Sequence, residues 1–341
     1  MRFRPATEDD LDRLLGCVVD ESISWSHPER LLSFLESGNY RYDRIWLAED
    51  EHTGDILARA VWWSFADGDR PLALDCLYVH PSVAERRGLA AELLRRAHDV
   101  YGQAPAYHVF LLNGWRDDPK ARAAIGWRWE AAGRAGLTEE LERLRYAWTA
   151  GDAPVPEPSK RLVFRADDDD EAFVAAFRRV AVGTLDFHTR QALAVTDPET
   201  QAREDVRDNR SMRGDRSWWR LAYVPGGGHS GGHSGGHSGG HSGGHSGDHS
   251  GDHSGDLVGV ALPSANDAGP VVGYIGVVPE QRGRGYVDDL LGEITRSHAE
   301  RGVQRIVADT DVGNVPMARA FERAGYRNFA VRLVLSPATG T

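Results

Sequence analysis

The chain has 341 residues, 41% of them apolar, and a formal net charge of −11. This length suffices for about two domains with real cores, and the negative charge argues against a nucleic-acid partner. The sequence contains neither an apolar run of the ~18 residues that a membrane span needs nor the apolar core of a signal peptide. We therefore expect a cytoplasmic protein that does not bind a membrane.

Apolar residues recur with strand and helix periods in the same order twice along the chain. Each copy is predicted to contain a strand, two helices, three strands, a helix, a strand, a helix and further strand structure. In the first copy we expect strands at 2–5, 43–49, 55–65, 71–80, 106–112 and 142–149, and helices at 8–20, 28–36, 86–101 and 118–135. In the second copy we expect strands at 161–166, 217–224, 257–263, 270–278, 304–310 and 328–336, and helices at 169–183, 198–210, 286–301 and 314–324.

Paired landmarks support an internal repeat. The Phe3-Arg4 strand start is answered by Phe164-Arg165, and the Val79-His-Pro segment by Val277-Val-Pro. A stretch rich in Pro, Gly and small residues separates the copies and is typical of a linker. The expected domains are 1–149 and 161–341, with a linker at 150–160.

Residues 226–256 form a Gly/His/Ser tract with a histidine every fourth residue. This composition cannot build a core, so we expect a disordered insert in the second copy. Neutral imidazoles are good ligands for zinc, nickel or copper. Metal binding by the tract is therefore an alternative to a neutral, expanded loop, and we expect no required metal elsewhere.

The most informative stretch runs from Val277 to Tyr286, where an apolar strand leads through Pro279 into Arg-Gly-Arg-Gly and then a helix. Glycines allow close backbone approach to a ligand, and the free N–H groups and dipole of a helix N-terminus favour an anion. The order of residues therefore predicts a phosphate or pyrophosphate site. The residues assigned to it are Val277, Val278, Arg282, Gly283, Arg284, Gly285, Tyr286 and Val287.

This loop resembles the acyl-CoA pyrophosphate loop of the GNAT superfamily of N-acetyltransferases. The resemblance continues downstream in Asn314-Val-Pro-Met, Ala320-Phe321 and Gly325-Tyr326. It implies an α/β fold class made of two tandem GNAT-like acyl-CoA N-acyltransferase folds, each a mixed twisted sheet flanked by helices. It also implies acetyl-CoA as co-substrate and an amine as acceptor.

The two copies preserve the pattern unequally. The first has Glu85 where Arg or Gln is usual, and Ile125 and Ala132 where the second has Asn314 and Phe321. A carboxylate beside a pyrophosphate is unfavourable. We therefore expect the first copy to be degenerate and non-catalytic, and the second to be the active domain.

The implied reaction is direct attack of a small-molecule primary amine on the acetyl thioester, which benefits from a base. Base candidates are Asp309 and Asp311, which share one strand face; a helix-capping role for one of them is the alternative. A backbone N–H near Val277 and Val278 would stabilise the oxyanion. The family often has a tyrosine that acts as the acid at the position of Phe321, so Tyr326 and Tyr274 are substitute candidates, with a place in the core as the alternative for Tyr326.

Three further residues are candidates for ligand contacts. Asn314 is expected either to bind the CoA arm or to cap its helix. Asp186 and His188 are expected in a loop between the first two helices of the second copy, which contacts the acceptor in this family. Alternatives to the enzyme are a catalytically weak CoA-binding or protein-interaction module and a metal-binding protein; we expect a monomer or homodimer.

Overall fold

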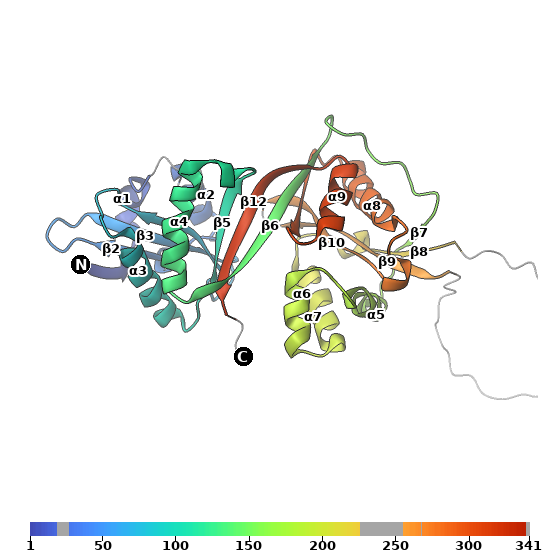
Figure 1. Ribbon diagram of the computed structural model, residues 1–341, viewed down its shortest axis with the longest axis horizontal. Helices are drawn as coiled ribbons and strands as arrows, with labels where there is room; N and C mark the ends of the chain where they lie inside the picture. Colours follow the sequence, from blue (N-terminus) through green and yellow to red (C-terminus); the bar gives the residue numbers. More distant parts are fainter. Residues whose placement is uncertain (19–26, 226–254, 267, 339–341) are drawn as a thin grey trace, which may run out of the picture. The chain divides into compact units, whose positions relative to one another are not determined.

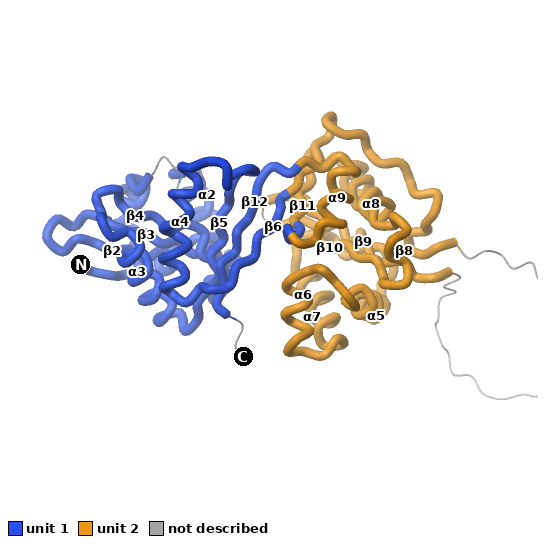
Figure 2. The backbone as a smooth tube through the Cα atoms, viewed as in Figure 1, with its two compact units in different colours: residues 1–145, 310–312, 328–341 blue, residues 146–309, 313–327 orange. Residues whose placement is uncertain are grey.

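A computed structural model of the chain describes residues 1–18, 27–225, 255–266 and 268–338. These residues form two units, one made of 1–145, 310–312 and the C-terminal segment from 328, and the other of 146–309 and 313–327 (Figure 2). The first unit therefore includes a strand from the far end of the sequence.

Unit 1 is built on a mixed sheet with the strand order β1-β2-β3-β4-β5-β12-β6 (Figure 1). The first four strands pair antiparallel, β4 and β5 pair parallel, and β12 pairs antiparallel with β5. The strands are β1 (Arg2–Pro5), β2 (Ile45–Glu49), β3 (Ile56–Trp63), β4 (Ala73–Val79), β5 (Ala106–Leu112), β6 (Leu137–Thr149) and β12 (Arg327–Pro337).

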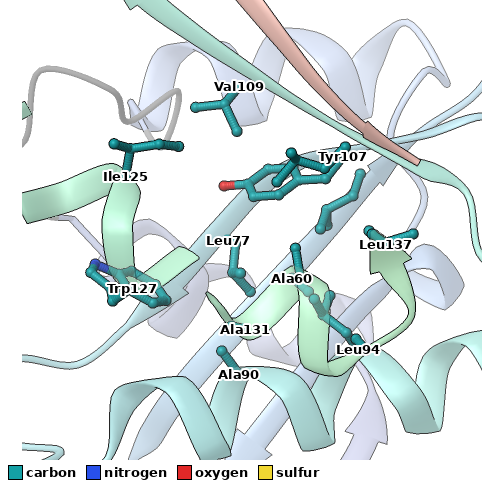
Figure 3. Close-up of a cluster of buried hydrophobic side chains, with 14 of the residues drawn as sticks. Ala60, Leu77, Ala90, Leu94, Tyr107, Val109, Ile125, Trp127, Ala131 and Leu137 are labelled. Carbon is teal, nitrogen blue, oxygen red and sulfur yellow. The ribbon is translucent and has the colours of Figure 1, made fainter. Parts of the chain in front are cut away.

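Helices cover both faces of the unit 1 sheet. Helices α3 (Arg86–Tyr101) and α4 (Pro119–Arg134) pack on one face in a large apolar cluster, of which Figure 3 shows Leu77, Tyr107 and Ala131. Helices α1 (Leu11–Leu15) and α2 (Pro28–Glu36) cover a smaller cluster on the other face. Burial of these apolar faces is the main stabilising contribution.

Unit 2 repeats this plan around strands β11-β10-β9-β8-β7, with the last residues of β6 beside β11. Strands β7, β8, β9 and β10 pair antiparallel, and β10 pairs parallel with β11. The strands are β7 (Val163–Arg165), β8 (Arg220–Tyr223), β9 (Leu257–Asn266), β10 (Gly269–Val277) and β11 (Arg305–Asp311).

The helices of unit 2 lie on opposite faces of its sheet, as Figure 1 shows. Helices α5 (Asp170–Ala181) and α7 (Pro198–Ser211) bury Phe173 and Val206, respectively, against one face. Helix α8 (Tyr286–Glu300) buries its own residues Leu290 and Ile294 against the other face. Helix α6 (Phe187–Val195) lies between α5 and α7 in sequence, and α9 (Val315–Arg323) follows β11.

Most expected elements are present, with four differences. The strand expected at 328–336 in the second copy is β12, which instead pairs with β5 in unit 1. The helix expected at 8–20 is a 3-10 turn, Glu8–Asp10, followed by α1 over Leu11–Leu15, and residues 19–26 lie outside the described residues. The strand expected at 142–149 begins at Leu137. The prediction of a loop at His188 is wrong, because His188 lies in helix α6. Asp186 caps this helix by accepting a hydrogen bond from the Thr189 N–H.

The His-rich tract lies almost entirely at 226–254, outside the described residues. The division into domains 1–149 and 161–341, with a linker at 150–160, stays a prediction.

Candidate functional site

The predicted anion loop connects β10 to α8 in unit 2. Val278 is fully buried, and a 3-10 turn, Pro279–Gln281, follows it. Gly283 and Gly285 have φ values of 76° and 73°, a left-handed backbone that glycine adopts without steric cost. Gly285 is the N-cap of α8, and no side chain caps this helix. The first N–H groups of α8 are therefore available to a ligand.

The equivalent helix of unit 1 is closed by the chain itself. Glu85 is the N-cap of α3, and its carboxylate accepts a hydrogen bond of 3.2 Å from the Gly88 N–H. A carboxylate at this position also interacts favourably with the helix dipole. An acid that already occupies the helix N-terminus opposes the binding of a second anion there.

Two carboxylates in the first turn of α8 are each paired with an arginine. Asp288 accepts a hydrogen bond of 2.7 Å from Arg323, and Asp289 is paired with Arg161. Arg161 also donates to the carbonyls of Arg284 and Gly285, at 3.0 and 3.1 Å. The acidic side chains are thus neutralised beside the candidate anion site.

The two arginines of the loop differ in their surroundings. Among the described residues, the guanidinium of Arg284 makes no ion pair and no side-chain hydrogen bond, and it is exposed. Arg282 instead donates to the carbonyls of Val277, Val180, Val182 and Gly183 at 2.8 to 3.2 Å. The structure therefore places Arg284, and not Arg282, with a side chain available for a phosphate.

Strand β10, which leads into the loop, is partly exposed to solvent along its length. All nine of its residues are half-buried, whereas all seven residues of β4, the equivalent strand, are buried. Its register with β11 contains one pair, Val271 with Val307, and a bulge interrupts its pairing with β9 between Val272 and Tyr274. The C-terminal part of β10 is therefore not paired with β11.

The bulge is filled differently in the two units. In unit 1 the pairing of β4 with β3 shifts register at Asp75. The buried Asp75 carboxylate accepts hydrogen bonds from Arg30, at 2.7 Å, and from Tyr40. In β10 the shift falls at Gly273, where an added Cβ would lie 2.6 Å from the Cβ of Ser264. A charged network thus occupies in unit 1 a position that carries no side chain in unit 2.

The predicted catalytic residues are distributed between the units. Asp309 is half-buried in the unit 2 part of β11. Asp311 belongs to unit 1, where it is buried and lies 3.1 Å from Arg143 Nε. Tyr326 is buried with its hydroxyl 2.7 Å from Thr295 Oγ1, and burial raises the pKa of its phenol. Asp311 and Tyr326 thus have evident structural partners.

The remaining predicted residues have defined local roles. Asn314 caps α9 by accepting a 3.4 Å hydrogen bond from the Met317 N–H. The Val278 N–H donates to the Val258 carbonyl at 2.9 Å, so this predicted oxyanion donor already has a partner. Asp186 accepts from both the N–H and the hydroxyl of Thr189, and His188 is exposed.

Tyr274 and Asp205 lie near Asp186; Tyr274 was a candidate acid from the sequence, whereas Asp205 was not identified from it. Tyr274 of β10 stacks on Phe177, with ring centroids 4.2 Å apart, and burial, reinforced by the charges of Asp205 and Asp186, raises its pKa. Asp205 accepts from the Gln201 amide at 2.8 Å, and burial, followed by nearby carboxylates, raises its pKa. Asp205 is one of many charges in the strongly polar α7, so no sequence signal distinguishes it.

A shallow hollow of about 620 Å³ also lies on unit 2. Its lining includes Arg179 of α5, Tyr223 of β8, and Glu280 and Gln281 at the start of the loop. It contains none of the predicted site residues.

Comparison with known proteins agrees with this geometry. The family model described as acetyltransferase (GNAT) family matches residues 237–326, which include the loop and α8. A search of curated proteins found no match.

Solved structures resemble the whole chain. A GCN5-related N-acetyltransferase from Sphaerobacter thermophilus is 16% identical with a TM-score of 0.55, and the match covers 98% of this chain and 94% of that one. A glucosamine N-acetyltransferase region of a fungal multi-domain β-N-acetylglucosaminidase is 13% identical with a TM-score of 0.53, over 98% of this chain and 38% of that one. At these identities the likeness shows the fold.

The fold is that of the acyl-CoA-dependent acetyltransferases, which bind acetyl-CoA as a co-substrate. Residues 237–326 thus match the GNAT acetyltransferase family, and the chain as a whole has a GNAT-like fold. No described helix is long and apolar enough to span a membrane. Within the same described ranges, no group of three or more His, Cys, Asp or Glu side chains is placed to hold a metal ion.

Proposed function

We propose that unit 2 is an N-acetyltransferase that transfers the acetyl group of acetyl-CoA to the primary amine of a small molecule. The donor site is the segment from Val277 to Val287. The observation that carries the proposal is the contrast between two equivalent helices, because α8 has no side-chain cap and α3 is closed by Glu85.

In this proposal the N–H groups at the start of α8 and the guanidinium of Arg284 bind the pyrophosphate. Gly283 and Gly285 allow the diphosphate to approach the backbone. Arg161 and Arg323 neutralise the acidic first turn of α8, which lowers repulsion of the ligand. No equivalent arrangement is proposed for unit 1.

The chemistry is attack of a neutral amine on the thioester carbonyl, with loss of one proton from nitrogen and departure of the CoA thiolate. Asp309, a candidate from the sequence, and Asp205, whose pKa is raised by burial, are the proposed proton acceptors in unit 2. A carboxylate with a raised pKa is a better base. We assign Tyr326 and Asp311 to the protein core, and the thiolate leaves without a tyrosine acid at Phe321.

A second candidate function is a CoA-binding module without turnover. Phe321, which occupies the position where the family often has an acidic tyrosine, is buried and stacks on Tyr146 with centroids 5.2 Å apart. This candidate shares the donor site with the first and differs in lacking transfer to an amine.

The donor assignment is tested by calorimetric titration of acetyl-CoA into the wild type, Gly285→Trp and Gly88→Trp. A tryptophan at Gly285 fills the approach to the first N–H groups of α8, so we expect loss of binding in that variant alone. Loss in Gly88→Trp alone would place the donor in unit 1. Binding without acetyl transfer in a screen of primary amines would favour the second candidate.

A further inference from the structure

Arg282 occupies a position that no phosphate contact explains. Its Nε donates to the Val277 carbonyl at 3.0 Å, at the end of β10. Its two terminal nitrogens donate to Val180, Val182 and Gly183, at 2.8, 2.8 and 3.2 Å. One side chain thus joins the start of the donor loop to the end of α5.

Two of the carbonyls that Arg282 contacts, those of Val180 and Val182, lie at the C-terminal end of α5. Helix α5 ends at Ala181, with Val182 as its C-cap, so the last carbonyls lack partners within the helix. A cation is also favoured there by the helix dipole. The planar fork of arginine serves several acceptors at once, which a lysine ammonium cannot do in the same geometry.

The segment after these carbonyls leads directly to α6. Gly183 has a φ of 64°, and a Cβ added to it would lie 3.3 Å from Arg282 Nη1. Three residues later, Asp186 caps α6 through Thr189 at 2.8 Å. The conformation of 182–186 therefore sets where α6 begins.

We propose that Arg282 is a positioning residue that ties the donor loop to the α5–α6 segment, so that acetyl-CoA binding at α8 also orders the start of α6. The ordering of α6 by acetyl-CoA rests on the proposed donor site. The tie itself is a property of the free protein. A role as a phosphate ligand would instead require the guanidinium to leave four carbonyls.

Hydrogen–deuterium exchange of the full chain, measured with and without acetyl-CoA, distinguishes a positioning role of Arg282 from a role as a phosphate ligand. In Arg282→Ala without ligand, we expect peptides covering 182–192 to exchange about tenfold faster than in the wild type, because several charge-assisted hydrogen bonds are lost. In the wild type, acetyl-CoA should slow exchange in both 182–192 and 283–290. In Arg282→Ala it should slow 283–290 only.

Arg284→Ala is the matched control, since it removes a neighbouring charge that has no partner among the described residues. It should weaken acetyl-CoA binding and leave exchange at 182–192 of the free protein unchanged. Arg282→Lys keeps the charge without the fork and should give intermediate exchange, which also guards against misfolding of the alanine variant.

Equal exchange at 182–192 in the wild type and Arg282→Ala would overturn the proposal, as would wild-type behaviour of Arg282→Lys. Failure of the wild type to bind acetyl-CoA would overturn the proposed donor site and the ligand-induced ordering. The difference between the ligand-free proteins would still decide whether the tie exists.

Discussion

Replacing Gly285 with alanine separates the conformational role of this residue from its role at the donor site. Its φ of 73° is in the left-handed region, which costs a residue with a Cβ about 1–2 kcal/mol. The added Cβ would meet little else, since the nearest atom is Arg161 Nη2 at 3.9 Å. The loss of stability should therefore come from backbone strain alone.

Gly302 provides the control at the other end of the same helix. Its φ is 78°, and an added Cβ would meet nothing within 4 Å. Gly302→Ala should thus lose a similar ~1–2 kcal/mol, which corresponds to a fall in melting temperature of about 2–4 °C per kcal/mol. Thermal unfolding of the two variants checks this equality.

Acetyl-CoA affinity should distinguish the two variants. A methyl group at Gly285 crowds the first N–H groups of α8, so we expect a loss of at least about tenfold in affinity, or ~1.4 kcal/mol. Gly302→Ala should bind as the wild type does. Equal affinities in the two variants would refute the assignment of Gly285 to the pyrophosphate site.

Two further predictions concern the cores. Hydrogen bonds from Arg4, at 2.6 and 2.7 Å, hold the pKa of Asp10 well below its usual range; the stability this gives is present above the unfolded pKa of about 4 and is lost as pH falls below it. Between pH 6 and 2, the free energy of unfolding measured with denaturant should therefore fall less steeply with pH in Asp10→Asn than in the wild type. An equal fall in the two proteins would contradict this. Phe321→Ala removes a ring that is 1% exposed and should cost about 3–5 kcal/mol, measured by urea unfolding against the exposed control Val315→Ala, which should change little.

Local features of the fold were predictable because they depend on nearby residues. The left-handed glycines of the donor loop and the buried face of α8, with Leu290 and Ile294, follow from turn chemistry and helical periodicity. The Asn314 cap was one of two expected roles. Helix α6 was missed because its apolar pattern is weak and its start depends on the Asp186 cap.

Features that depend on distant partners were not predictable. Strand β12 lies between β5 and β6 of unit 1, a pairing that no local pattern encodes. The Arg282 side chain contacts carbonyls about 100 residues earlier in the chain, so the loop motif alone suggested a phosphate contact. The pKa of Asp205 is raised by burial, which polar composition does not indicate.

The central claim is that one of the two similar units carries the donor site. Its most direct test is the stoichiometry of acetyl-CoA binding to the full wild-type chain, measured by calorimetry at protein concentrations above the dissociation constant. We expect one molecule of acetyl-CoA per chain, because Glu85 closes α3 and α8 is uncapped. Two molecules per chain, or none, would contradict this account.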